Sequence, residues 1–268
     1  MRYIFYFTAL AGLFSSCTQH YFYSPNTLHL PAVRERGDMT AEISLNGSNQ
    51  IKGLELKAAY CPIAKTSVMV NYMHLQGSYN INNSFVFPPV PPEQHSGRGY
   101  LAEFGVTRHL IIDEYRMFTL TAGGGIGRSV NDYDLSRVAE LKFNRLFIQP
   151  AFVSQGEMAD FGIGLRFSRL GFYSGSVDFR IDEDDLTSIR KIDENDPFWI
   201  PDIGLSAGIN FAPVHLKCNL ALSMYDKNDD YSFSGSNLGV SLLVDVDNIF
   251  KKKTTASSKK KKKKKGRH

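Results

Sequence analysis

Two long stretches near the C-terminal end alternate apolar and polar residues at every second position. The apolar sets are Val214, Leu216, Cys218, Leu220, Leu222 and Met224 in the first stretch, and Leu238, Val240, Leu242, Val244 and Val246 in the second. A period of two places each set on one face of a pleated strand. Each stretch has about ten residues, which exceeds an ordinary soluble strand and matches the roughly 9–11 residues of a transmembrane β-strand. The pair therefore predicts a hairpin of membrane-spanning strands.

The same alternation recurs along residues 38–250, and it predicts ten strands. Short turns follow every second strand, while longer loops are expected over about 77–98, 129–142 and 172–198. An even strand number with short periplasmic turns and longer outer loops is the pattern of outer-membrane barrels. We therefore expect an all-β fold, an up-and-down antiparallel transmembrane β-barrel in the bacterial outer membrane. Both termini are expected on the periplasmic side.

The first residues read as a targeting segment. Arg2 precedes the apolar run from Tyr3 to Phe14, which is too short for a membrane-spanning helix and is typical of a secretory signal. Residues 1–17 end in Leu-Phe-Ser-Ser-Cys, which resembles a bacterial lipoprotein signal, so we expect Cys17 to be lipidated. Ordinary cleavage near Ser16 is the alternative. Residues 18–37 show no regular alternation and are predicted to be a periplasmic linker.

The charge of the chain is divided between its body and its tail. The formal net charge is +4, but residues 251–268 hold ten lysines and Arg267 without any acid, so the body is acidic. This composition predicts a disordered poly-Lys tail. The tail is expected to contact anionic lipid or a protein partner, with a merely solvated tail as the alternative. No nucleic-acid partner is expected, because an exported chain rarely meets nucleic acid.

Two motifs carry a resemblance to a known group of proteins. Tyr60-Cys61-Pro62-Ile63 leads into a short turn, and residues 237–244 read Asn-Leu-Gly-Val-Ser-Leu-Leu-Val. With the strand pattern, they make residues 38–250 resemble the small porin-like outer-membrane barrels of Bacteroidota-type bacteria. The resemblance implies outer-membrane lipid and the barrel-assembly machinery as partners. The last strand departs from the assembly signal, since it has no aromatic residue at Leu242 or Val244.

The polar face of the strands carries the candidate site. In a barrel with apolar residues facing lipid, this face points into the lumen. Ten strands enclose little more than their side chains can fill, and unpaired buried charges are costly. We expect ion pairs across the lumen, with a narrow polar conduit as the alternative. The polar network comprises Glu42, Glu55, Lys57, Glu103, Arg145, Arg166 and Lys217, together with Asp160, Asp202 and Asp245.

Other polar clusters give weaker signals. Asp182, Glu183, Asp184 and Asp185 could form a cation-binding loop, although they lack the spacing of a known calcium loop. The histidines are dispersed and show no metal-ligand spacing, so we expect no metal site and no cofactor. The sequence predicts that the protein is not an enzyme. An outer-membrane enzyme with rim residues such as Asp132, Asp134 and His95 is an alternative.

The expected function is that of an outer-membrane barrel lipoprotein with a structural, interaction or small-solute passage role. A soluble lipocalin-like, ligand-binding lipoprotein is the leading alternative, because a period of two cannot say which face lies inside. In that alternative, the apolar face lines a cavity and the charged face meets water.

Overall fold

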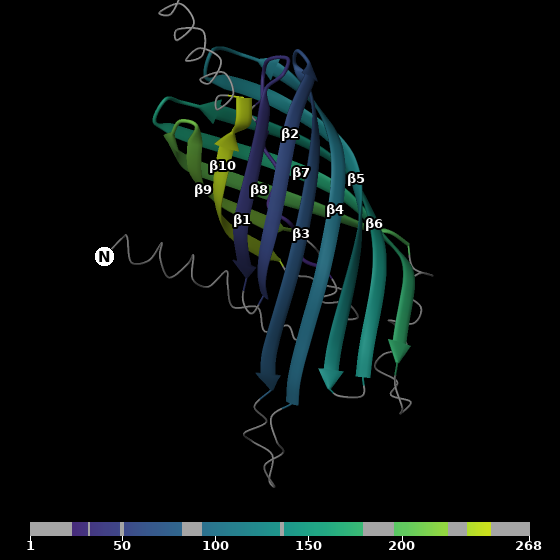
Figure 1. Cartoon of the computed structure of the whole chain (residues 1–268). Coiled ribbons are helices and arrows are strands. Elements are labelled where there is room, and N and C mark those ends of the chain that lie inside the picture. Colours follow the sequence, from purple (N-terminus) through teal and green to yellow (C-terminus); the bar gives the residue numbers. More distant parts are fainter. Residues whose placement is uncertain are drawn as a thin grey trace, which may run out of the picture.

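The computed structural model describes residues 23–31, 33–48, 51–81, 93–134, 137–178, 196–224 and 235–247. The strands are β1 (Met39–Ser48), β2 (Ile51–Ile63), β3 (Thr66–Ile81), β4 (Glu93–Ile111), β5 (Arg116–Asp134), β6 (Arg137–Gln155), β7 (Ala159–Asp178), β8 (Phe198–Phe211), β9 (Val214–Ser223) and β10 (Ser236–Asp245). Each pairs antiparallel with its neighbour in sequence, and β1 also pairs with β10, which closes the barrel (Figure 1). The ten-stranded fold is confirmed. Among the described residues, no helix is long and apolar enough to cross a membrane.

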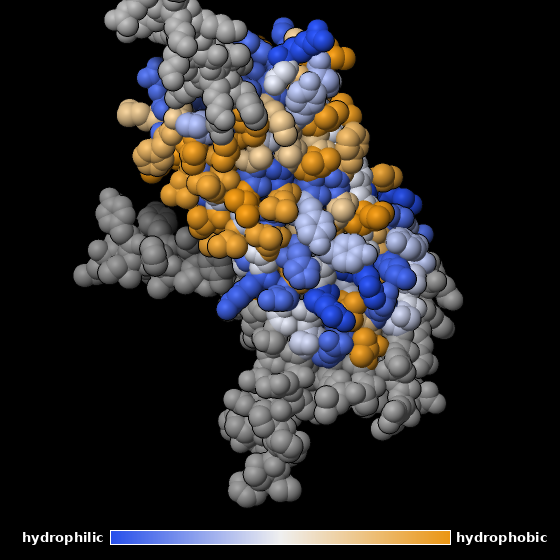
Figure 2. Space-filling view, viewed as in Figure 1, coloured by the Kyte–Doolittle hydropathy of each residue, from blue (hydrophilic) through white to orange (hydrophobic). Residues whose placement is uncertain are grey.

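The apolar set of each strand faces outward and the polar set faces the lumen. Leu216 and Leu242 are 47% and 43% exposed, whereas their strand neighbours Lys217 and Ser241 are buried. Figure 2 shows apolar residues gathered in a band across the face formed by β1 to β4, with hydrophilic residues on both sides of it. An apolar belt around a polar interior is the arrangement of outer-membrane barrels. It is the reverse of the lipocalin-like alternative, which the structure therefore contradicts.

The two ends of the barrel differ. At one end, which we call the short-turn end, few residues join β2 to β3, β4 to β5, β6 to β7 and β8 to β9. The opposite end is called the loop end. Strands β3 to β7 have 16–20 residues, whereas β1, β9 and β10 have ten each. The long strands extend one flank of the barrel beyond the other at the loop end (Figure 1).

The turn before β5 illustrates how the short-turn end is held. The Asp113 carboxylate accepts hydrogen bonds from the backbone N–H groups of Tyr115 (2.9 Å) and Arg116 (2.7 Å). It also pairs with the Arg116 guanidinium, whose hydrogen bond lowers the pKa of Asp113. Because the pair is exposed, its main effect is to fix the turn geometry, and it adds little stability.

The predicted loops at the loop end are too long. Strands β3 and β4 remain paired as far as Ile81 and Glu93, inside the expected loop 77–98. The expected loop over 129–142 is wrong, because β5 and β6 stay paired up to Asp134 and Arg137. Strand β7 likewise continues to Asp178, inside the expected loop 172–198. In these extensions the outward side chains include charged residues such as Arg128 and Glu140, and buried Ala139 and Leu141 face inward, so the apolar-outward alternation of a membrane strand is lost.

Candidate functional site

A segment of the chain that precedes β1 fills the lumen. Residues 23–31 and Val33 are all buried, although they belong to no strand of the barrel. Tyr23 packs with Leu101, Leu141 and Phe172 in the half of the barrel nearer the loop end. Eleven residues later the chain reaches the short-turn end, where the Arg34 carbonyl accepts a hydrogen bond from the Lys65 backbone N–H. Residues 23–31 and Val33, which we call the lumen segment, therefore cross the interior lengthwise.

This position corrects the prediction of a periplasmic linker. Residues 18–37 lack periodicity, and the described part of them lies inside the barrel instead of leading up to it. An interior segment needs no strand pattern, because its backbone is bonded by side chains of the wall. Gln149 Nε2 of β6 donates to the His29 carbonyl (2.8 Å), and Asn237 Nδ2 of β10 donates to the Pro25 carbonyl (2.8 Å).

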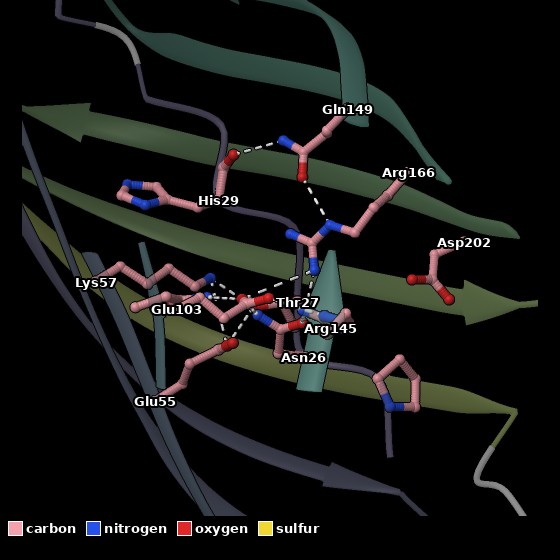
Figure 3. A network of polar contacts seen from close by, with 12 residues as sticks. Asn26, Thr27, His29, Glu55, Lys57, Glu103, Arg145, Gln149, Arg166 and Asp202 are labelled. Atoms are coloured by element: carbon pink, nitrogen blue, oxygen red, sulfur yellow. Dashed lines mark hydrogen bonds and ion pairs between the residues drawn. The ribbon is translucent and has the colours of Figure 1, made fainter. Parts of the chain in front are cut away.

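Two arginines, one glutamate and Asn26 form the central polar cluster (Figure 3). Arg145 Nε lies 2.9 Å from Glu103 Oε1, and a second guanidinium nitrogen contacts the same oxygen. The Asn26 side-chain carbonyl accepts from Arg145 (2.6 Å) and from Arg166 (2.6 Å). Its amide nitrogen donates to Glu103 Oε2 (2.5 Å). One residue of the lumen segment thus touches all three buried charges.

The register of the wall brings these charges together. Glu103 on β4 and Arg145 on β6 both pair with Gly125 on β5. A Cβ at Gly125 would stand 2.8 Å from Glu103 Cγ and 2.5 Å from the carbonyl oxygen of Ala102, so a side chain there would push the pair apart. Across the barrel, Arg166 on β7 is the register partner of the buried Asp202 on β8.

A second cluster joins the segment to β1 and β2. Lys57 Nζ lies 3.3 Å from Glu42 and 3.4 Å from Glu55. The Thr27 hydroxyl accepts a hydrogen bond from Lys57 and donates one to Glu55. All three charged side chains are buried. Buried ion pairs with additional hydrogen bonds are tolerated because each charge keeps its partners.

Apolar residues of the segment fit against wall positions that lack side chains. A Cβ built on Gly204 of β8 would lie 2.7–2.9 Å from three atoms of Leu28. A Cβ on Gly162 of β7 would lie 2.6 Å from Leu30, and one on Gly164 would lie 3.0 Å from Leu28. These glycines form a groove in the wall that Leu28 and Leu30 occupy. The groove explains why glycines recur on the inward face of β7 and β8.

A third cluster lies near the short-turn end, and His215 is its one member that sequence reasoning missed. His215 of β9 contacts Asp160 through Nδ1 (2.9 Å) and Asp245 through Nε2 (2.9 Å). Lys217 Nζ is 3.8 Å from Asp160. Strict alternation already placed His215 beside Lys217 on the inward face, and that was the available signal. The cluster ties β7, β9 and the end of β10 together.

Of the ten residues of the expected polar network, nine face the lumen and are buried, and Asp245 is half-buried at the short-turn end. The structure brings them together in two groups, Glu103 with Arg145 and Arg166, and Glu42 with Glu55 and Lys57, while Lys217 joins the third cluster. Cys17 and the acidic residues 182–185 lie outside the described residues. In the described part of the chain, no group of three or more His, Cys, Asp or Glu side chains is arranged so that it could hold a metal ion.

Solved structures that are similar to this chain come from several bacteria. The outer membrane protease OmpT of Escherichia coli is 10% identical over 78% of this chain and 91% of that chain, with a TM-score of 0.40. LpxR from Salmonella typhimurium is 10% identical over 76% and 99%, with a TM-score of 0.34. OccD3 from Pseudomonas aeruginosa is 9% identical over 78% and 90%, with a TM-score of 0.20. No protein-family model and no curated protein matches the sequence.

These comparisons correct one prediction from the sequence. The expectation that the protein is not an enzyme is contradicted, because the solved barrels similar to this chain include a protease, OmpT. The sequence argument rested on the absence of a recognisable motif, and residues that lie on different strands and loops leave no such motif. At these TM-scores, the likeness concerns barrel architecture and assigns no activity to this chain.

Proposed function

We propose that this protein is an outer-membrane barrel closed by its own lumen segment, and that it acts through its outer surface and loops instead of passing solutes. The observation that carries the proposal is the burial of residues 23–31 and Val33 inside the barrel. Three sets of contacts between the lumen segment and the wall support it: those of Asn26, those of Thr27, and the packing of Leu28 and Leu30 in the glycine groove.

The energetics favour a segment that stays in place. Withdrawal of Asn26 would remove a partner from Arg145, Arg166 and Glu103 at once. Each buried polar group left without its hydrogen bond costs about 1–3 kcal/mol, and more when it is charged. Water entering the vacated lumen would recover part of this cost. The closed lumen is therefore the favoured state. A closed lumen supports a structural or interaction role in preference to small-solute passage.

The path of the segment also bears on orientation. With the short-turn end on the periplasmic side, as in other outer-membrane barrels, β10 ends on that side at Asp245. Tyr23, however, lies in the half nearer the loop end. We infer from this position of Tyr23 that a lipid on Cys17 belongs to the outer leaflet. This proposal differs from the expectation that both termini are periplasmic. A tag between Cys17 and Tyr23 should be accessible to a protease added to intact cells.

Conductance of the purified full-length protein in planar bilayers tests the closed lumen. We expect no stable channel steps from the wild type. A variant with Asn26→Gly, Leu28→Gly and Leu30→Gly should show open events, whereas the outward-facing Leu238→Ala control should stay silent. Stable conductance by the wild type would refute the closed barrel. A silent loosened variant that is folded would show that the wall alone closes the lumen and that the segment has another role.

A further inference from the structure

The outward face of β2 to β6 changes character abruptly toward the loop end. In the cross-strand row of Leu56, Tyr72 and Ile126, the side chains are apolar or aromatic and 43–58% exposed. The next outward row holds Leu54, His74, Tyr100, Arg128 and Lys142, and the row beyond it holds Lys52, Gln76, Arg98, Val130 and Glu140. Successive rows are two residues apart, or roughly 7 Å along a strand. Residues that border the apolar band of an outer-membrane barrel lie at the membrane interface, so these two rows are expected at the height of lipid headgroups.

The basic side chains of these two rows differ in whether an acidic side chain of the barrel pairs with them. Arg128 and Lys142 share Glu140, at 2.6 Å and 3.3 Å. In the described part of the chain, Lys52 and Arg98 have no acid within ion-pair distance, and both are exposed. Their strands are separated only by β3, whose Gln76 pairs in register with both Lys52 and Arg98. The result is a row of cation, amide and cation.

A hollow of about 550 Å³ lies beside this row. Its lining residues are Lys52, Gln76, Gly77, Ser96, Gly97, Arg98 and Asp132. Asp132 accepts a hydrogen bond from Ser96 (3.3 Å) at one side of the hollow. The side chains of Lys52, Gln76 and Arg98 offer N–H donors, which match the oxygens of a phosphate group.

We propose that this surface, which we call the basic row (Lys52, Gln76 and Arg98), binds the phosphate of an outer-leaflet lipid headgroup. A lipid bound there would lay its acyl chains along the apolar rows that begin at Leu56 and Tyr72. This continuity of basic row, hollow and apolar band favours a lipid over an acidic protein, which would need no apolar surface below the charges. The proposal rests on the outer-membrane orientation in the proposed function, but it does not depend on whether the lumen is closed.

The test measures lipid retention by native mass spectrometry on the full chain in detergent. The probe is a diphosphorylated glucosamine lipid, and its dephosphorylated counterpart with the same acyl chains is the matched ligand. We expect the double variant Lys52→Gln, Arg98→Gln to bind the phosphorylated probe about 30-fold more weakly, which corresponds to about 1 kcal/mol per basic residue. Arg108→Gln is the control, because Arg108 is exposed on the same strand near the short-turn end.

Heat-modifiable mobility on gels confirms that each variant is folded, and the single variant Arg98→Gln serves if the double variant is not. Equal binding of the two lipids, or an unchanged affinity in the folded double variant, would overturn the proposal. Displacement of the lipid by millimolar inorganic phosphate alone would also overturn it, since the site would then be one for a soluble anion. An equal loss of binding in Arg108→Gln would also overturn the proposal, because the effect would then come from the general surface charge and not from the basic row.

Discussion

Gly204→Ala in β8 offers the sharpest test of the lumen segment. The new Cβ would lie 2.7 Å and 2.9 Å from the two Cδ atoms of Leu28 and 2.8 Å from its Cβ. Three contacts below 3.0 Å cannot be relieved by one rotamer change, because the Cβ of Leu28 is among them. Overpacking of this kind typically costs about 1–3 kcal/mol. We expect the free energy of unfolding to fall by that amount.

The same substitution should behave differently once Leu28 is removed. Leu28→Gly deletes all three clashing atoms, and on its own it should cost at least the about 2–5 kcal/mol of a large-to-small core change. In that background, Gly204→Ala should be neutral or slightly stabilising, because a strand glycine is replaced without a clash. The expected coupling between the two sites is about 1–3 kcal/mol. Gly235→Ala is the control, since nothing lies within 4 Å of its Cβ position.

Urea unfolding in phospholipid vesicles provides the measurement. Trp199 is the single tryptophan of the chain, and it is 69% exposed on the outward face of β8, so its fluorescence reports on contact with lipid. An equal cost of Gly204→Ala in the wild-type and Leu28→Gly backgrounds would refute the packing of the segment on this wall. So would the absence of any cost in the wild-type background.

Four further predictions concern the faces, the central charges and the two ends of the chain. Leu220→Arg should lower the folded fraction on heat-modifiable gels, because a lipid-facing charge costs about 2–4 kcal/mol; normal assembly would mean that Leu220 does not face lipid. Glu103→Gln should reduce the unfolding free energy by about 3–5 kcal/mol, because two buried arginines lose their acid; a smaller loss would indicate that water screens them. Mass spectrometry of the mature protein should find acyl mass on Cys17 and none of residues 1–16. Deletion of 251–268 should leave assembly unchanged and weaken salt-sensitive binding to anionic vesicles, whereas equal vesicle binding at low salt would leave the tail without a membrane contact.

The alternation of apolar and polar residues was sufficient to predict the strands within the membrane. It also predicted which residues would face each other in the lumen, because every second residue of a strand lies on one face. A period of two alone could not show whether the apolar set faces inward or outward. It follows from the structure, in which Leu216 is exposed and Lys217 is buried. Only a lipid environment makes that arrangement favourable.

The extensions of β5 and β6 were missed for the opposite reason. Toward the loop end, the outward side chains include Arg128, Asp132 and Glu140, while the inward face mixes Ser129 and Asn131 of β5 with apolar residues of β6. Charged residues on the outward face and a mixed inward face remove the apolar-outward alternation that marked the other strands. Backbone pairing continues there without help from lipid, because the ladder hydrogen bonds need no apolar face.

The lumen segment left a subtler signal in the wall than in its own sequence. Eleven residues without periodicity are typical of a linker. The identities of Asn26 and Thr27 do not predict contact with charged residues more than 25 positions away in the sequence. The wall, however, has glycines at inward positions 162, 164 and 204, which leave room that a closed barrel must fill. It also holds Arg145 and Arg166, which both form their ion pair with Glu103. Leu28 and Leu30 fill the volume that the glycines leave, and the Asn26 carbonyl accepts a hydrogen bond from each arginine.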